Sequence, residues 1–354
     1  MIISRLVEGS RRFSTGVRIA LLVTGLLLAF GMPWFIYPPV ALDIVAWGLF
    51  AVALDLLLGY TGLLSFGHAA FWGSSAYATG IIAIESGLPF YLAVLGGAVV
   101  AALIALPIAM LSVRRTGIYF AMVTLAFAQL VFYIANQWRS VTGGENGLQG
   151  IPREFFGLDL SDSFFFYYAA LPLLLLGLCF AWRVVHSPFG RVLVAIRENP
   201  ARARALGYPV DRYKVQVFVL SAFLAGLAGG VYAISHGFAS LQEVYWTTSG
   251  KVVVMTILGG MGTLWGPVLG AGVIVTLEDF LATAGIDANR VLMGAIFVIT
   301  VLLFRRGVWG TVRHLFRPRD GGSEDAGGGD REEPDPDPSD ARSPERDRAA
   351  ARGT

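Results

Sequence analysis

The chain has 354 residues, of which 55% are apolar and 15% charged, and its formal net charge is +2. Its mean hydropathy of +0.63 leaves too little polar surface for a soluble domain of this length. A single cysteine, Cys179, excludes an internal disulfide framework. Apolar stretches recur at about the length of one bilayer crossing, roughly 20 residues. The composition therefore predicts an all-α integral membrane protein.

The positive charge is concentrated in residues 1–317, which carry 21 basic and 14 acidic side chains. These basic residues flank apolar spans and do not cluster among aromatic residues, which argues against nucleic-acid binding. Residues 1–16 are basic and lack a small-residue cleavage site. We therefore expect a cytoplasmic N-terminal segment and not a removed signal peptide.

Ten apolar segments follow one another along residues 17–304, the expected transmembrane region. Two of them, 69–84 and 249–264, are marginal in length. The expected bundle thus has about ten transmembrane helices, some short or broken by glycine. The predicted spans are 17–36, 40–59, 69–84, 89–112, 117–137, 164–185, 214–236, 249–264, 266–284 and 288–304.

The basic connections decide that both marginal spans cross. Arginines mark the N-terminal segment, the turn at 114–115, the connection 183–214 and the exit at 305–306. Short basic connections favour the cytoplasm, and only ten crossings place all four on that side. Both termini are therefore predicted to be cytoplasmic, in a multi-pass protein of a bacterial-type inner (plasma) membrane.

Two polar segments lie outside the predicted bundle. Residues 139–163 form the one sizeable external loop of this topology. Residues 305–354 form a cytoplasmic tail that has almost no apolar side chains from about residue 318. Such a segment cannot bury enough surface to offset its ordering entropy, so we expect it to be disordered. A dispensable extension is favoured over a regulatory or docking tail.

The segment 187–212 carries the signals of two short helices. Ser187 and Asn199 are each followed by proline, which suits a capping residue and the first position of a helix. Gly207 suits a left-handed helix end. The small apolar side chains of this segment face either the membrane body or a partner. The alternatives are a contact for another protein and an interfacial helix lying among lipid headgroups.

Two glycine-rich stretches, at 59–67 and 259–266, interrupt the apolar spans. Hydrocarbon cannot hydrogen-bond the backbone groups that such an interruption frees, so it is tolerated only where it packs on protein or lines a water-filled path. Paired interruptions in two halves of a transporter point to the translocation route, and close helix packing is the alternative. The candidate path or gate residues are Asp55, Gly59, Gly62, Ser65, Gly67, His68, Gly259, Gly260, Gly262 and Gly266.

Ionisable residues inside a membrane are costly and usually face the bundle interior or water. Asp55 is the deepest of those in the predicted spans. Asp43, Glu278 and Asp279 fall near span ends, where the cost is lower and no function is required. His68 is most simply a packed histidine with a satisfied hydrogen bond.

The chain lacks the motifs of an enzyme or an energy-coupling domain. No G-x-x-x-x-G-K-[ST] phosphate loop is present, and no His/Cys set or H-E-x-x-H pattern suggests a metal site. No nucleophile–base constellation suggests catalysis. We therefore expect no cofactor in this chain, with ATP and Mg bound by a separate partner.

The run VAIRENPARARALGYPVDRYKVQVFVLSAFLAGLAGGVYA at 194–233 resembles the permeases of branched-chain amino acid ABC transporters, the LivM-type subunit. GYTGLLSFGHAAFWG (59–73), TGGENGLQGIPR (142–153) and SGKVVVMTILGGMGTLWGPVLGAG (249–272) also look like signatures of that family, in the expected order. The resemblance covers roughly residues 40–305. It implies that 187–212 is the coupling element that docks on the ATPase. The implied coupling residues are Arg191, Arg197, Glu198, Asn199, Ala203 and Gly207.

The resemblance also implies the assembly and the substrate class. The expected partners are a second, LivH-type permease, two cytoplasmic ABC ATPase subunits, a periplasmic or lipid-anchored binding protein, and membrane lipid. The implied substrates are leucine, isoleucine and valine, although similar permeases serve urea, short amides and other amino acids. An ion-coupled secondary transporter that uses Asp55 as a proton or sodium site is a further alternative.

Overall fold

The computed structural model describes residues 25, 27, 29–155, 158–283 and 294. The predicted N-terminal segment, half of the first span, the last span at 288–304 except residue 294, and the tail from 305 lie outside the described residues. Every structural statement below concerns the described part of the chain.

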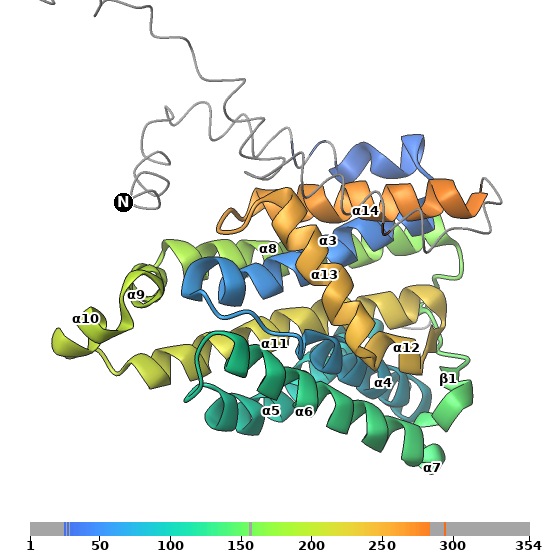
Figure 1. The fold of residues 1–354 in the computed structure, drawn as a ribbon. Helices are drawn as coiled ribbons and strands as arrows, with labels where there is room; N and C mark the ends of the chain where they lie inside the picture. Colours follow the sequence, from blue (N-terminus) through green and yellow to red (C-terminus); the bar gives the residue numbers. More distant parts are fainter. Residues whose placement is uncertain (1–24, 26, 28, 156–157, 284–293, 295–354) are drawn as a thin grey trace, which may run out of the picture. The chain divides into compact units, whose positions relative to one another are not determined.

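The described part of the chain is helical, with short strands only between residues 148 and 159 and at 238–239 (Figure 1). The strands form two antiparallel pairs, β1 with β4 and β2 with β3. The helices are α3 (Pro38–Thr61), α4 (His68–Ser86), α5 (Phe90–Ser112), α6 (Ile118–Gln137), α7 (Arg139–Thr142), α8 (Ser163–His186), α9 (Pro188–Glu198), α10 (Pro200–Ala205), α11 (Val210–His236), α12 (Leu241–Val244), α13 (Trp246–Gly259) and α14 (Trp265–Thr283). The remaining elements are the 3-10 turn η1 (Gly144–Asn146) and the strands β1 (Leu148–Gln149), β2 (Glu154–Phe155), β3 (Leu158–Asp159) and β4 (Phe238–Ala239).

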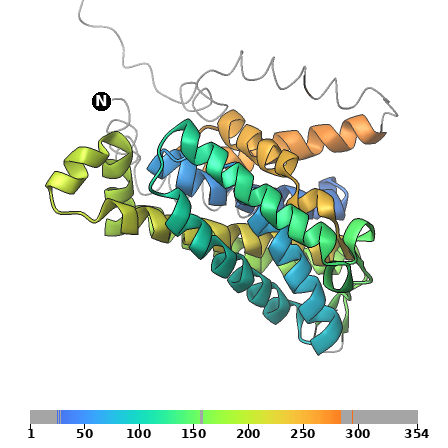
Figure 2. The same cartoon turned by 60° about the horizontal axis from the view of Figure 1, so that its bottom comes forward.

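Helix α3 is the centre of the bundle. Its most apolar 18-residue window is 94% buried, against 28% for α6 and 39% for α5. Apolar side chains therefore surround α3 on all sides, while the apolar outer faces of α5 and α6 are left for lipid. Helix α11 packs on α3, α4 and α5, and α14 packs on α3 and α13 (Figures 1 and 2).

Six of the described helices are long and apolar enough to cross a membrane: α3, α5, α6, α8, α11 and α14. These six confirm the corresponding predicted spans. The two marginal spans, which correspond to α4 and α13, do not meet the length and hydropathy required of a membrane-crossing helix. Helix α4 has 19 residues with a lower hydropathy, and α13 has only 14 because it ends at Gly259. The total of ten crossings stays a prediction.

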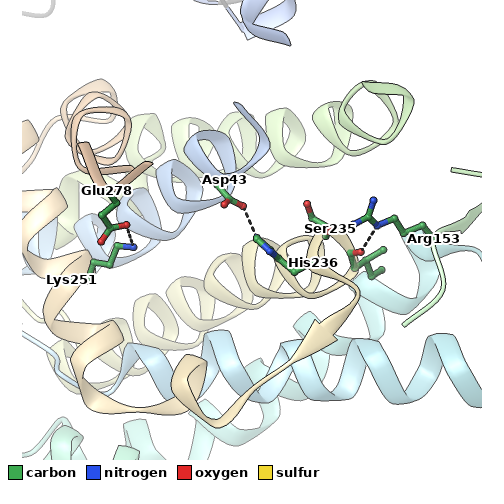
Figure 3. Close-up of polar contacts among 7 residues, drawn as sticks. Asp43, Arg153, Ser235, His236, Lys251 and Glu278 are labelled. Carbon is green, nitrogen blue, oxygen red and sulfur yellow. Dashed lines mark hydrogen bonds and ion pairs between the residues drawn. The ribbon is translucent and has the colours of Figure 1, made fainter. Parts of the chain in front are cut away.

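The connection 139–163 contacts the C-terminal end of α11. Strand β1 pairs with β4, which directly follows α11. The Arg153 guanidinium donates hydrogen bonds to the carbonyls of Ile234 (3.1 Å), Ser161 (3.2 Å) and Ser235 (Figure 3). The last carbonyls of α11 thus gain a cationic donor, as helix C-termini favour.

Candidate functional site

The two glycine-rich stretches meet at the C-terminal end of α3. The carboxylate Oδ1 of fully buried Asp55 accepts a hydrogen bond from the backbone N–H of Gly262, 2.8 Å away. A Cβ on Gly59 would lie 2.1 Å from that oxygen and 2.5 Å from the Gly262 nitrogen. Only glycine at 59 allows this approach. We call the meeting point of Asp55, Gly59, Gly62, Gly260 and Gly262 the glycine junction.

The connection between α13 and α14 needs glycine for its backbone. Gly260 and Gly262 have φ of +116° and +77°, a region that side chains disfavour. A Cβ on Gly259 would lie 1.9 Å from the carbonyl oxygen of Gly266. The Thr263 hydroxyl donates to the Gly260 carbonyl at 2.7 Å and accepts from the Gly266 N–H at 3.2 Å. The turn is therefore closely packed and internally hydrogen-bonded.

The break before α4 is satisfied by hydroxyl groups. Ser65 Oγ accepts from the Gly67 N–H (3.2 Å), Thr124 Oγ1 from the Phe66 N–H (3.3 Å) and Ser249 Oγ from the Ala69 N–H (2.8 Å). The first N–H groups of a helix lack intrahelical partners, and hydrocarbon cannot supply them. Side chains from α6 and α13 thus make a broken helix tolerable at this depth.

His68 is a fully buried packing residue. Its Nε2 lies 2.7 Å from the Ser221 hydroxyl, which donates onward to the Ala53 carbonyl. Its ring packs edge-on against Phe71 and Phe218. These contacts tie α4 to α11 and α3 and make His68 a packing residue. Only its Nε2 is hydrogen-bonded, because Nδ1 is buried without a partner among the described residues.

The helical pair expected in the segment 187–212 is confirmed. Ser187 Oγ accepts from the Gly190 N–H at 3.4 Å and begins α9, and Asn199 Oδ1 accepts from the Arg202 N–H at 3.0 Å and begins α10. Gly207 has a φ of +87°, the left-handed geometry predicted for the end of the pair. A coupling role for the pair stays a prediction.

The pair has one face on the bundle and one face open. Ile196 and Ala203 are buried with Val210 at the start of α11. The open face includes an apolar residue, Leu206, which is 71% exposed. Of the predicted coupling residues, Arg191, Glu198, Asn199 and Gly207 are exposed and Ala203 is buried.

Arg197, one of the predicted coupling residues, faces the bundle and is only partly exposed. Its side chain turns inward from α9, and Nη1 donates to the Gly59 carbonyl at the end of α3. A Cβ on Gly62 would lie only 3.1 Å from Arg197 Cγ. The guanidinium supplies the cation that a helix C-terminus favours. One side chain thus joins the segment 187–212 to the glycine junction.

The charged residues of the other helix ends are paired. Asp43 Oδ1 lies 3.0 Å from His236 Nε2, and Lys251 forms an ion pair with Glu278 (Figure 3). Asp279 is exposed. Sequence reasoning missed Lys251, although its position inside the predicted span 249–264 was the signal.

Comparisons with known proteins match most of the chain. A family model described as "Branched-chain amino acid transport system / permease component" matches residues 39–301. The LivM permease of Salmonella typhimurium is 29% identical over 76% of this chain and 69% of its own length. LivM of Escherichia coli is 28% identical over 77% and 70%.

A second group of relatives consists of permeases of a different import system. LsrC of Klebsiella pneumoniae, an autoinducer 2 import system permease, is 32% identical over 49% of this chain and 52% of its own length. No solved structure matches the chain.

Proposed function

Because the chain belongs to the family of permease components of branched-chain amino acid transport systems, we propose that it carries these amino acids across a bacterial inner membrane. It is a multi-pass membrane protein and the permease subunit of an ATP-driven importer. The transport role needs a gated path and no covalent chemistry in this chain.

The assembly we propose contains a second, LivH-type permease, two ATPase subunits that bind ATP and Mg, and a substrate-binding protein. The open face of α9 and α10 is the proposed contact with the ATPase. Arg191 and Glu198 offer charges there, and exposed Leu206 offers an apolar anchor. A charged rim around an apolar residue suits a protein interface better than a lipid surface.

The link from α9 to the glycine junction is the observation that carries the mechanism. Arg197 bonds to the Gly59 carbonyl, and Asp55 in the same turn region bonds to the Gly262 N–H. In the proposed cycle, ATP binding displaces α9 and α10, and Arg197 transmits that displacement to the ends of α3 and α13. The junction then changes the angle between these helices, which opens or closes the path.

We further propose that the two short spans complete their crossings with adjacent segments that are separate from the main helix. Residues 62–67 continue the path of α4, and α12 with its flanking residues continues the path of α13. We place the C-terminal ends of α3 and α13 on the side of α9, because Gly62 lies beside Arg197 and Gly59 lies beside Gly262. Together with the first and last predicted spans, this arrangement gives the ten crossings and the cytoplasmic termini that we propose.

Reconstitution tests the proposed function directly. The purified complex, with ATP sealed inside proteoliposomes and binding protein outside, should accumulate labelled leucine. Accumulation should persist when ionophores collapse proton and sodium gradients. Uptake of urea or acetamide in place of leucine would reassign the substrate. Uptake that needs an ion gradient and no ATP would overturn the proposal in favour of a secondary transporter.

A further inference from the structure

At the end of the bundle away from α9, four helices bring charged and aromatic side chains together. Lys251 of α13 is paired with Glu278 of α14, and its ammonium lies 4.0 Å from the ring centre of Trp47 on α3. Asp43, one helical turn before Trp47, is paired with His236 of α11. We call these five residues the outer charge cluster. Figure 3 shows its two ion pairs, Asp43 with His236 and Lys251 with Glu278.

The cluster is far from the coupling segment along α3. Asp43 precedes Gly59 by 16 residues, which corresponds to about 24 Å of α-helix. In the proposed topology the cluster therefore lies toward the side from which substrate arrives. The glycine junction lies at the opposite end of the same helix.

The charged groups are held in place but remain accessible. The side chains of Lys251 and Glu278 are 26% and 35% exposed, and those of His236 and Asp43 are 27% and 20% exposed. Trp47, by contrast, is 6% exposed, and it stacks on fully buried Trp72 at 5.0 Å. The buried stack of Trp47 on Trp72 thus supports the Lys251 ammonium, which a small ligand can reach.

A lysine at this position is unusual for this sequence. The chain carries two lysines, Lys214 and Lys251, and its other basic side chains, apart from the histidines, are arginines. An ammonium is a compact charge with three donors on a flexible stem, so it can exchange one carboxylate partner for another. A guanidinium would favour a fixed two-pronged pair with Glu278.

We propose that the outer charge cluster is a transit site for the charged ends of a zwitterionic α-amino acid, which inserts between Lys251 and Glu278. This proposal rests on the proposed function for its substrate class. The ligand carboxylate takes the place of Glu278 beside Lys251, and the ligand ammonium binds the carboxylate of Glu278. Asp43 supplies a second carboxylate one helical turn away.

The pairing explains why a zwitterion is the preferred ligand. A zwitterion enters an ion pair and leaves every charge compensated, with no net charge added in a medium of low dielectric. An amine or a carboxylate of the same shape would leave one protein charge without a partner, which is strongly unfavourable away from water. The site therefore recognises the ammonium and carboxylate groups common to amino acids, and the binding protein selects the side chain.

Saturation-transfer NMR on the complex without binding protein tests this site. L-Leucine should give a transfer signal, whereas 3-methylbutylamine, which lacks the carboxylate, and 4-methylpentanoate, which lacks the ammonium, should not. Equal signals from leucine and either analogue, or no signal from leucine, would overturn the proposal. This comparison uses the unmodified protein, so it decides the question even if variants fail to assemble.

The variant K251M/E278Q removes both charges together, which is far milder for folding than removal of one partner. Its leucine signal should disappear, and leucine uptake should fall about tenfold, as expected for loss of a charge-assisted contact. The matched control R204Q/D211N removes the exposed ion pair of the segment 187–212, and its leucine signal should equal that of the unmodified complex. An unchanged leucine signal in K251M/E278Q would overturn the site. Absence of ATP-driven uptake in the unmodified complex, with the NMR selectivity intact, would instead refute the proposed function.

Discussion

The carboxylate of Asp55 and the backbone N–H of Gly262 form a 2.8 Å hydrogen bond between residues 207 positions apart. The bond joins the end of α3 to the turn that follows α13, and Gly59 leaves the space that it needs. An acidic side chain that hydrogen-bonds a freed backbone group is thereby partly compensated for its burial. This contact gives Asp55 a structural role in the glycine junction, while its other oxygen, Oδ2, is buried without a hydrogen-bond partner among the described residues.

We predict that Gly59→Ala destabilises the protein by about 1–3 kcal/mol, the usual cost of overpacking. The added Cβ would lie 2.1 Å from Asp55 Oδ1, and the Gly262 backbone prevents the carboxylate from moving aside. Thermal unfolding of the purified protein in detergent measures the effect. Gly250→Ala in α13 is the matched control, because a Cβ there meets nothing within 4 Å. Equal unfolding temperatures for the two variants would contradict the packing of the junction.

Arg197 and Glu198 are neighbours with opposite orientations, and we predict different effects for their variants. Arg197→Met removes the hydrogen bond to the Gly59 carbonyl, so leucine transported per ATP should fall by roughly tenfold while the ATPase still co-purifies. Glu198→Lys reverses an exposed charge and should weaken co-purification of the ATPase. If Arg197→Met loses the ATPase as readily as Glu198→Lys, then Arg197 contacts the partner directly.

Gly207→Val should misplace α10 without disturbing the spans. At a φ of +87° a β-branched residue is strained, at a cost of roughly 1 kcal/mol or more. No atom lies within 4 Å of the added Cβ, so this variant tests backbone strain without steric overlap. Uptake and ATPase co-purification should both fall at normal membrane abundance. Asparagine tolerates this backbone region, so Gly207→Asn should behave nearly as the unmodified protein; equal losses in both variants would point to a direct contact of Gly207 with the partner.

The topology predicts opposite labelling of Glu145→Cys and Ala201→Cys. Both positions are exposed, Glu145 in the external loop and Ala201 in α10. Exposed Cys179 must first be replaced by serine to give a background without thiols. A membrane-impermeant maleimide added to intact cells should label position 145 and spare position 201. Labelling of both positions, or of position 201 alone, would refute the proposed orientation.

The helices and their ends could be predicted from sequence because they depend on local chemistry. Apolar length placed α3, α5 and α8, and the Ser187 and Asn199 caps placed α9 and α10. The glycine-rich stretches were recognised as breaks for the same reason. Their contact with each other could not be foreseen, since Asp55 and Gly262 meet only through the packing of α3 against α13 and α14.

Side-chain direction was the main property that sequence reasoning could not supply. Arg197 reads as one more exposed arginine among several, and its inward turn depends on the unpaired carbonyls at the end of α3. The pairing of Lys251 with Glu278 likewise depends on α13 and α14 packing side by side, which sets residues 27 positions apart in contact.

The hydroxyl groups at the start of α4 reduce its capacity to bind an anion. A broken helix in a transporter can present its positive end to a negatively charged substrate group. Here the Ser249 and Thr124 oxygens already occupy the N–H groups of Ala69 and Phe66. A substrate carboxylate would have to displace both hydroxyls to be held there. The start of α4 is therefore already satisfied by protein hydroxyl groups, and a passing substrate can be released from it readily.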